Sequence, residues 1–314
     1  MTAKRPVAAQ PVILPKAGSL PEPEAAVDYT QVLAGPSQRL MTSMTGLAVI
    51  ILGFFFVYPM VMGAVDGLGW ILRGQPGTFQ TYWTSAIGFE YPEGMVAANL
   101  GLAALTGVAI LAVRFLHRRA PVWLSSVQPG LRWRYMLIVA VVAVVVLNTS
   151  YWLSDGRVNF HWNPSPNLWV WLVLIVVTAP LQAAGEEYFF RGYLAQLIGS
   201  MVRQKWVVVV VSAVAFTALH GTQNVPLLVD RIAFGAILGA LVVLTGGLEA
   251  AIAAHAVNNV FAFGYAAMSG GVAAARSLTE VTWVTAGVNI AAYVVIAAVA
   301  YAIGRAMRVA TTTP

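Results

Sequence analysis

The stretch LWVWLVLIVVTAPLQAAGEEYFFR, residues 168–191, places two adjacent carboxylates and an arginine at the end of a long apolar run. A run of this length can cross a bilayer as a helix, which needs about 20 apolar residues. Ionisable groups at membrane depth are costly, so they face a protein interior and mark a functional site by default. The stretch therefore predicts a transmembrane helix that carries Glu186, Glu187 and Arg191 at a buried polar site.

Two further apolar segments carry polar groups of the same kind. His220 ends the run that starts at Trp206, and His255 and Asn259 lie inside the run 248–263. Three such segments are hard to explain as independent accidents, because each polar group in the membrane costs free energy. We expect the three segments to converge on one site.

The composition is that of a polytopic membrane protein. Of 314 residues, 59% are hydrophobic and 10% are charged, whereas a soluble domain carries about 25% charged residues. The net charge of +6 is small and its basic residues cluster in loops, so we expect membrane lipid and no nucleic acid as a partner. The chain has no cysteine, which excludes disulfides, thiolate zinc sites and thiol proteases.

The predicted fold class is all-α: a polytopic transmembrane helical bundle with a polar intramembrane cavity. About eight segments are apolar enough to span the membrane, at residues 43–65, 94–115, 134–153, 168–198, 206–221, 230–246, 248–265 and 282–304. Residues 1–40, rich in proline, alanine and charge, predict a disordered cytoplasmic tail. Residues 41–310 are expected to form a single transmembrane domain.

Loop charges predict the orientation. In an eight-span bundle, the basic residues of the tail, of two loops and of the C-terminus all fall on one side, and the other loops are nearly neutral. By the positive-inside rule, both termini of this multi-pass protein are cytoplasmic, at the cell membrane. His117 in a loop and Glu249 at a helix end are expected at the surface or the membrane interface.

Spacing along the helices predicts which polar groups meet. Glu187 and Arg191 are four residues apart in the order that favours an ion pair, which would leave Glu186 free. At about 1.5 Å per residue, Glu186 and His220 each lie roughly 20 Å from the turn that joins their helices. A carboxylate and an imidazole at one depth can hold and deprotonate a water.

The third segment offers a donor pair, and each group also has a structural interpretation. His255 and Asn259 share one helix face, where they could stabilise an oxyanion; two histidines and a glutamate could instead hold a metal with one position open to water. Structurally, an i,i+4 ion pair can hold helices together, a histidine can snorkel and an asparagine can bond a neighbouring helix. Spacing alone does not choose between these.

Three motifs in this order resemble a known family: Glu186-Glu187-x-x-x-Arg191, Phe216-x-x-x-His220 and His255-Ala256-x-x-Asn259. They are similar to the motifs of the CPBP intramembrane proteases. That family includes the CAAX prenyl endopeptidases of the Rce1 type, the bacteriocin-processing and immunity proteins and the Abi proteins. The resemblance covers residues 130–265, and it implies an endopeptidase that acts on a membrane-associated protein or peptide.

The resemblance also implies roles for the site residues. Glu186 and His220 activate the water, and His255 and Asn259 bind the oxyanion, with the Glu187–Arg191 pair in support. Family members are described both as metalloproteases and as metal-independent glutamate proteases. A divalent ion such as zinc would be held by Glu186, His220 and His255. We favour the metal-independent account, because two histidines and a free carboxylate can perform the chemistry without an ion.

Two other functions stay open. A non-catalytic protein of the same fold could act as a bacteriocin immunity factor or an assembly scaffold. A proton-coupled transporter would also use membrane carboxylates, but the sequence shows no internal repeat of the kind many transporters have. The chain contains no H-E-x-x-H or G-x-G-D motif that would indicate another class of protease.

Overall fold

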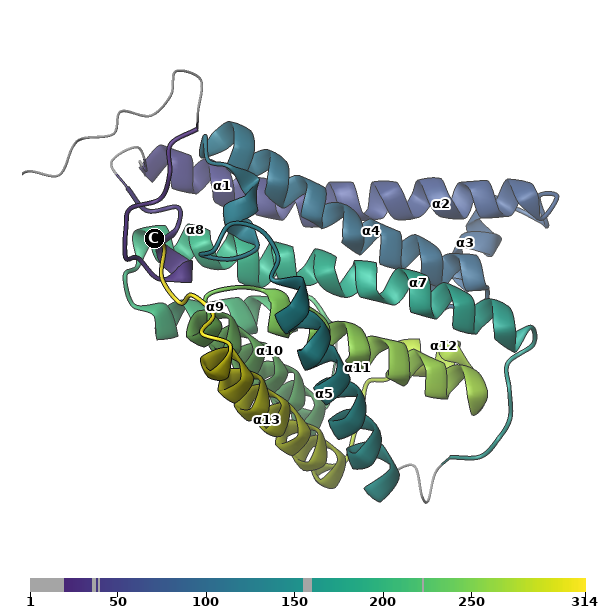
Figure 1. Cartoon of the computed structure of the whole chain (residues 1–314). Coiled ribbons are helices and arrows are strands. Elements are labelled where there is room, and N and C mark those ends of the chain that lie inside the picture. The colour runs from purple at the N-terminus through teal and green to yellow at the C-terminus, as the bar shows by residue number, and fades with distance from the viewer. Residues whose placement is uncertain (1–19, 36–37, 39, 155–159, 222) are drawn as a thin grey trace, which may run out of the picture.

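The computed structural model of the chain describes residues 20–35, 38, 40–154, 160–221 and 223–314. In these residues the secondary structure is helical, with three isolated bridges and no strand (Figure 1). The all-α fold class predicted from the sequence is therefore confirmed.

Each apolar segment expected to span the membrane is a helix. Six helical stretches of the described chain are long and apolar enough to cross a bilayer, namely Leu40–Leu72, Pro92–Leu116, Trp133–Leu153, Leu168–Met201, Val225–Thr245 and Trp283–Ala306. The other two are α9 (Lys205–Ala218), which is shorter, and α11 (Glu249–Met268), whose middle carries a histidine and two asparagines. The protein is a multi-pass membrane protein, and the number of about eight spans is approximate.

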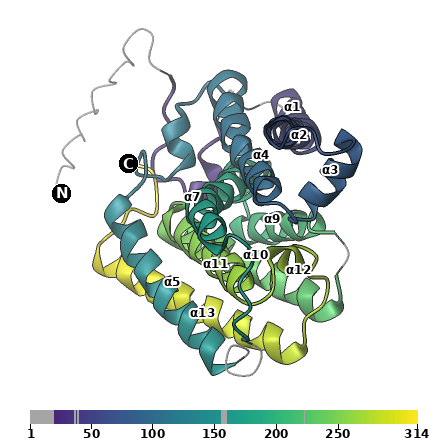
Figure 2. The same cartoon turned by 90° about the vertical axis from the view of Figure 1, so that its right-hand side faces the viewer.

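The helix that carries the two glutamates lies at the centre of the bundle. This helix, α7 (Leu168–Glu186), packs against α4 (Pro92–Leu111) on one side and α11 on the other, as the end view of Figure 2 shows. Helix α2 (Tyr58–Leu72) lies outside α4, and α5 (Trp133–Leu153) lies against α11. The remaining group packs α9 on α10 (Val225–Thr245) and α10 on α13 (Trp283–Ala306).

The central helix changes type at the glutamate pair. It is α-helical to Glu186, π-helical over Glu187–Leu194 (η5) and α-helical again over Ala195–Met201 (α8). π-Helical turns are rare and occur frequently at functional sites. Gly185 precedes the change, and a Cβ there would lie 2.2 Å from the carbonyl oxygen of Leu102 on α4. Glycine at this position lets the two helices touch beside the glutamates.

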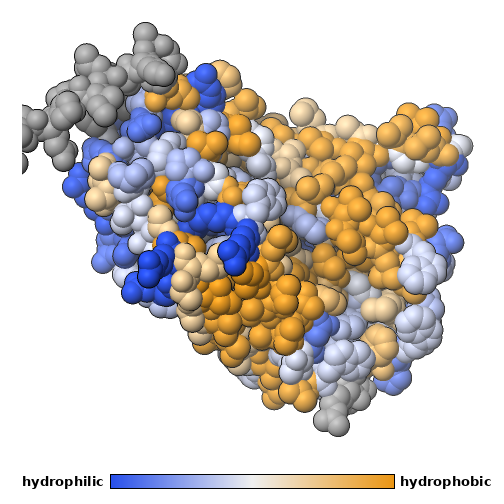
Figure 3. Space-filling model, viewed as in Figure 1, coloured by the Kyte–Doolittle hydropathy of each residue, from blue (hydrophilic) through white to orange (hydrophobic). Residues whose placement is uncertain are grey.

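The surface has a broad apolar band between more polar ends (Figure 3). Large apolar side chains stand exposed along the outward faces of the helices, for example Val141 and Val145 on α5 and Val173, Val176 and Val177 on α7. In water such a surface would drive aggregation, and in a bilayer it faces lipid. The band agrees with the membrane location expected from the composition.

Part of the predicted tail lies against the bundle. Residues 1–19 are outside the described residues, but Tyr29 and Val32 have no exposed surface, and the Tyr29 hydroxyl donates to the carbonyl of Leu124. The backbone N–H of Thr313 donates to the carbonyl of Val27 at 2.9 Å, so both ends of the described chain meet at one end of the bundle (Figure 1). A few apolar side chains that precede the predicted boundary at residue 40 therefore lie on the core.

The loop that precedes α5 folds inward and corrects two expectations. Leu248 donates its N–H to the carbonyl of Ser125, and the loop covers the tight turn between α10 and α11, where Gly246 has a φ of +68°. Glu249, expected at the membrane interface, is buried and paired with Arg132 at 2.6 Å. His117, expected at the surface, is 7% exposed. Both expectations were wrong, because the loop covers Glu249 and because His117 packs against Gln38 and Tyr193.

Candidate functional site

The three motifs lie on neighbouring elements. Glu186 is the last residue of α7, and Glu187 and Arg191 lie in η5. Helix α11 packs along α7 and carries His255. His220 follows the end of α9, which contacts η5. The helices that carry the three motifs therefore lie next to one another, as expected.

The ion pair predicted from the i,i+4 spacing is present. Nη1 of Arg191 lies 3.0 Å from Oε1 of Glu187, and the two side chains are 1% and 0% exposed. The guanidinium carbon of Arg191 also lies 4.1 Å from the centre of the Phe216 ring. The pair is buried among aromatic side chains and confirms the prediction.

His255 links the two adjacent glutamates. Its Nδ1 lies 2.7 Å from Oε1 of Glu187, and its Nε2 lies 3.4 Å from Oε2 of Glu186. The first contact is a short hydrogen bond and the second is longer than a strong one. Glu187 therefore positions both Arg191 and His255, and His255 presents its second nitrogen to Glu186.

The charges of this cluster are buried. Two carboxylates and one guanidinium lie together with His255, and all four side chains are nearly inaccessible to solvent. An uncompensated buried charge is strongly destabilising. Arg191 compensates Glu187 directly, and Glu186 lies beside the His255 ring.

An amide that the sequence analysis did not single out joins the site. Oε1 of Gln182, one turn before Glu186, accepts a hydrogen bond from Nδ2 of Asn259 at 2.6 Å. The Gln182 amide also interacts with the Glu186 carboxylate. Asn259 in turn accepts from Nδ2 of Asn258 at 3.2 Å. Gln182 is a lone amide in an apolar run, four residues before Glu186, and that spacing was the signal that could have identified it.

His220 lies apart from Glu186. Its Nδ1–H donates to the carbonyl of Phe216 at 2.8 Å, and its ring centre is 4.5 Å from the Phe216 ring. The described part of the chain has no hydrogen bond or ion pair between His220 and Glu186. The similar depth predicted from helix length does not bring His220 into contact with Glu186. The Phe216 ring lies beside both histidines, 4.5 Å from the His220 ring and 6.1 Å from the His255 ring.

The donor set does not fit a metal as the motifs alone suggested. Among the described residues, no three His, Asp or Glu side chains are grouped so that they could hold an ion. Both ring nitrogens of His255 face carboxylates, and Nδ1 of His220 is taken by a carbonyl. The ligand set Glu186, His220 and His255 is therefore not assembled here.

A cavity of about 740 Å³ lies elsewhere, at the end of the bundle away from the termini. None of the residues predicted for the site lines it. The buried ionisable groups with short mutual contacts lie at the glutamate pair instead, whereas the ion pair that lines the cavity, Arg73 with Glu93, is partly exposed.

Comparison with known proteins agrees with the motifs. Residues 165–261 match the model of the Rce1-like family, described as type II CAAX prenyl endopeptidase Rce1-like. This confirms the family resemblance, and the matched stretch contains all three motifs. The chain is 27% identical over 177 residues to the uncharacterized protein YyaK of Bacillus subtilis (strain 168). The alignment covers 51% of this chain and 56% of YyaK, so the chain spans about half the length of that relative. No solved structure matches the chain.

Proposed function

We propose that this multi-pass membrane protein is an intramembrane endopeptidase that hydrolyses a membrane-associated protein or peptide. The observation that carries the proposal is the contact of His255 with both adjacent glutamates, inside a segment that matches the Rce1-like family. A buried carboxylate beside an imidazole is an arrangement that general acid–base catalysis uses.

Glu186 is the base in this proposal. It takes a proton from a water as the water oxygen attacks the carbonyl carbon of the peptide, and His255 positions the Glu186 carboxylate for this transfer. When the tetrahedral intermediate collapses, the same proton goes to the leaving amine, so the products are a carboxylic acid and an amine. The 3.4 Å separation of His255 Nε2 and Glu186 Oε2 is of the kind that tightens when a substrate binds.

Asn259 supplies the donor for the oxyanion. One of its two amide hydrogens is used by Gln182, and the other has no partner among the described residues. A preorganised N–H aimed at the developing charge lowers the barrier of acyl transfer. His255, which the family resemblance places in this role, has both ring nitrogens directed to carboxylates. We therefore propose that His255 positions the base, Glu186, and that Asn259 binds the oxyanion.

His220 keeps a place at the edge of the site. Because Nδ1–H donates to a carbonyl, the neutral ring presents an unprotonated Nε2, which has no partner in the described residues. This nitrogen accepts a hydrogen bond from a substrate N–H or from the water. The half-buried position of His220 leaves it reachable from outside the cluster.

The test is proteolysis by the purified protein in lipid nanodiscs, with a panel of membrane-inserted fluorogenic peptides. Glu186→Gln keeps the size of the side chain and removes the base, so cleavage should fall by about 10²- to 10⁴-fold. The matched control is Glu280→Gln, which removes an exposed carboxylate far from the site in sequence and should leave the rate unchanged. Thermal unfolding of both variants checks that they are folded.

Other outcomes would support other functions. A Glu186→Gln protein that keeps its full cellular function would indicate a scaffold or immunity role, which does not need a base. Proton-coupled flux in vesicles would indicate a transporter. Loss of cleavage with a chelator, restored by zinc, would contradict the metal-independent mechanism.

A further inference from the structure

The site described above offers a single free amide hydrogen to an oxyanion. That hydrogen belongs to Asn259, and both ring nitrogens of His255 are directed to carboxylates. Sites of acyl transfer stabilise the oxyanion with preorganised donors, and a tyrosine hydroxyl is one of the groups that serve. A second donor would have to come from another element that lies near Glu186.

The first membrane-spanning stretch carries a tyrosine near its middle. This stretch, Leu40–Leu72, consists of α1 (Leu40–Leu52), the π-helical turn η2 (Gly53–Val57) and α2, which begins at Tyr58. π-Helical turns occur frequently at functional sites, and one of them here ends directly before Tyr58. The middle of a membrane span has no bulk water to bond a polar side chain.

Contacts between two antiparallel stretches place Tyr58 at the level of Glu186. A Cβ on Gly46 would lie 2.9 Å from a methyl carbon of Leu197, and a Cβ on Gly53 would lie 3.4 Å from Cε2 of Phe189. Seven residues forward in the first stretch thus correspond to eight residues backward in the second. Five further residues lead from Gly53 to Tyr58 and, in the second stretch, from Phe189 to the residues directly before Glu186.

Helix α4 gives the same placement independently. A Cβ on Gly101 would lie 2.8 Å from Cδ2 of Tyr58, and a Cβ on Gly185 would lie 2.7 Å from Cα of Ala103. Tyr58 and Gly185 therefore contact the same turn of α4. Because Glu186 follows Gly185, the tyrosine lies in the same layer of the bundle as the proposed base.

The Tyr58 ring is held in place, and its hydroxyl is free. The half-buried ring stacks on Phe54, with ring centres 5.6 Å apart and planes 28° apart. The hydroxyl makes no hydrogen bond with the described residues, and it interacts electrostatically with Arg276, Glu186 and Asp66. A hydroxyl without a partner in apolar surroundings costs free energy. A substrate that binds beside Glu186 would supply the partner.

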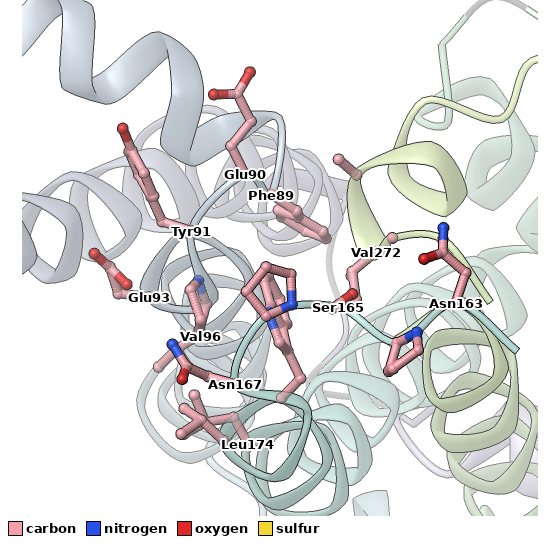
Figure 4. A pocket seen from close by; sticks show the side chains of 18 of the residues that line it. Phe89, Glu90, Tyr91, Glu93, Val96, Asn163, Ser165, Asn167, Leu174 and Val272 are labelled. Carbon is pink, nitrogen blue, oxygen red and sulfur yellow. The ribbon is translucent and has the colours of Figure 1, made fainter. Parts of the chain in front are cut away.

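The two arginines nearby are engaged elsewhere. Arg276 ends α12 (Val272–Arg276), and its guanidinium carbon lies 5.3 Å from the centre of the Phe89 ring, which lines the cavity shown in Figure 4. Arg231 on α10 donates to the carbonyl of His220 at 3.3 Å and to Oε1 of Gln223 at 3.1 Å. Charges of both signs surround the Tyr58 hydroxyl, so its position and its unused O–H carry the argument.

We propose that the Tyr58 hydroxyl is a second oxyanion donor, beside Asn259, in the peptide hydrolysis proposed above. It donates a hydrogen bond to the oxygen of the scissile carbonyl, and this bond strengthens as negative charge develops on that oxygen. Tyr58 keeps its proton throughout. The inference rests on the proposed function, and it extends the site to α2, outside the residues 165–261 that match the family.

The first test is steady-state cleavage of the fluorogenic peptides by full-length protein in nanodiscs. Tyr58→Phe keeps the ring and its stacking on Phe54 and removes only the hydroxyl. The kcat should fall by about 10²- to 10³-fold, the loss measured for one oxyanion donor in a protease. The KM should change little, because the bond is made mainly in the transition state. The matched control is Tyr301→Phe, which removes a hydroxyl from a side chain 38% exposed on α13 and should leave kcat unchanged.

The second test does not depend on activity. It uses ¹⁹F NMR of the protein with 3-fluorotyrosine in place of Tyr58, and of a control protein with 3-fluorotyrosine in place of Tyr301. Glu186→Gln should shift the resonance at position 58, because the carboxylate lies near that ring, and should leave the resonance at position 301 in place.

The outcomes separate this inference from the proposed function. If the wild type cleaves the peptides and Tyr58→Phe has the same kcat, or only a raised KM, the oxyanion role of Tyr58 is wrong and the proposed function stands. If the resonance at position 58 does not respond to Glu186→Gln, the placement of Tyr58 beside the base is wrong, whatever the activity. If the wild type cleaves no peptide, the proposed function fails and the oxyanion role of Tyr58 fails with it.

Discussion

Nδ2 of Asn259 lies 2.6 Å from Oε1 of Gln182, so one hydrogen bond joins α11 to α7 one turn from Glu186. This bond uses one hydrogen of the Asn259 amide and orients the other. Gln182, 7% exposed, also interacts with the Glu186 carboxylate. It therefore positions both the proposed base and the proposed oxyanion donor without reacting itself.

Gln182→Leu should lower kcat by about tenfold to hundredfold with little change in KM, because a small misplacement of catalytic groups costs that much. The measurement is steady-state cleavage of the fluorogenic peptides by each variant. The control is Thr178→Val on the preceding turn, which removes the bond from Asn99 and the bond that Thr178 donates to the carbonyl of Leu174 and should leave kcat unchanged. Equal kcat in Gln182→Leu and the wild type would show that the bond has no positioning role.

Removing Arg191 should destabilise the protein. Arg191→Ala strands the buried Glu187 carboxylate, and breaking a buried pair costs about 3–5 kcal/mol. The measurement is thermal unfolding in detergent, which should show a clearly lower midpoint than for Arg203→Ala, a change of an exposed arginine. Because the cost lies in the unpaired charge, the double variant Glu187→Leu with Arg191→Met should be more stable than Arg191→Ala. The opposite order would mean that the pair does not stabilise the fold through charge compensation.

The sequence predicted the helices and the local ion pair because both depend on short-range patterns. Apolar run length locates the helices, and i,i+4 spacing places Glu187 beside Arg191. The contact of His255 with both glutamates could not be predicted in this way. It depends on how α11 packs on α7 and on the π-helical turns that begin at Glu187, and neither leaves a periodic signal.

The misplaced expectations have a common cause. Depth along separate helices suggested that Glu186 and His220 meet, but depth says nothing about rotation, and the Phe216 ring lies beside both His220 and His255. His117 was assigned to the surface because it lies in a loop and Glu249 because it lies at a helix end, yet His117 packs against Gln38 and Tyr193 and the loop before α5 covers Glu249. Loop packing is a tertiary property that composition does not report.

The orientation stays a prediction that fusions can test. The pairing of Val27 with Thr313 places both described ends at one end of the bundle, and the loop charges predict that this end is cytoplasmic. Reporter fusions after Arg134 and after Arg308 should both give cytoplasmic signals. A fusion in the loop 73–78 should give the opposite signal and serves as the control. An extracytoplasmic signal from either of the first two fusions would contradict the predicted orientation.

Mild acidification should destabilise the protein, because the unfolded chain binds a proton at His117 more readily than the folded protein does. Burial, and then the nearby Arg119, lower the pKa of His117 from 6.5 to about 4. Its Nε2 lies 3.0 Å from the hydroxyl of Tyr193 and its Nδ1 lies 3.2 Å from Oε1 of Gln38. Because Gln38 donates its Nε2–H to Ser43, its Oε1 accepts from Nδ1–H. The folded ring is therefore neutral, with Nε2 as the acceptor for Tyr193.

The direction of this change in stability follows from the pKa values of His117 in the unfolded and folded states. Above pH 6.5 neither state holds the extra proton, and the full stability is present. Between pH 6.5 and about 4 the unfolded chain binds a proton that the folded protein does not, so the free energy of unfolding falls by about 1.4 kcal/mol per pH unit from this group. Below about pH 4 the folded ring also takes the proton, and the loss of stability levels off.

Thermal unfolding in detergent from pH 7.5 to 4.5 should show this loss of stability in the wild type and a smaller loss in His117→Gln. Because the glutamates titrate in both proteins, the difference between the two curves isolates His117. Parallel curves would mean that His117 titrates alike in the folded and unfolded states.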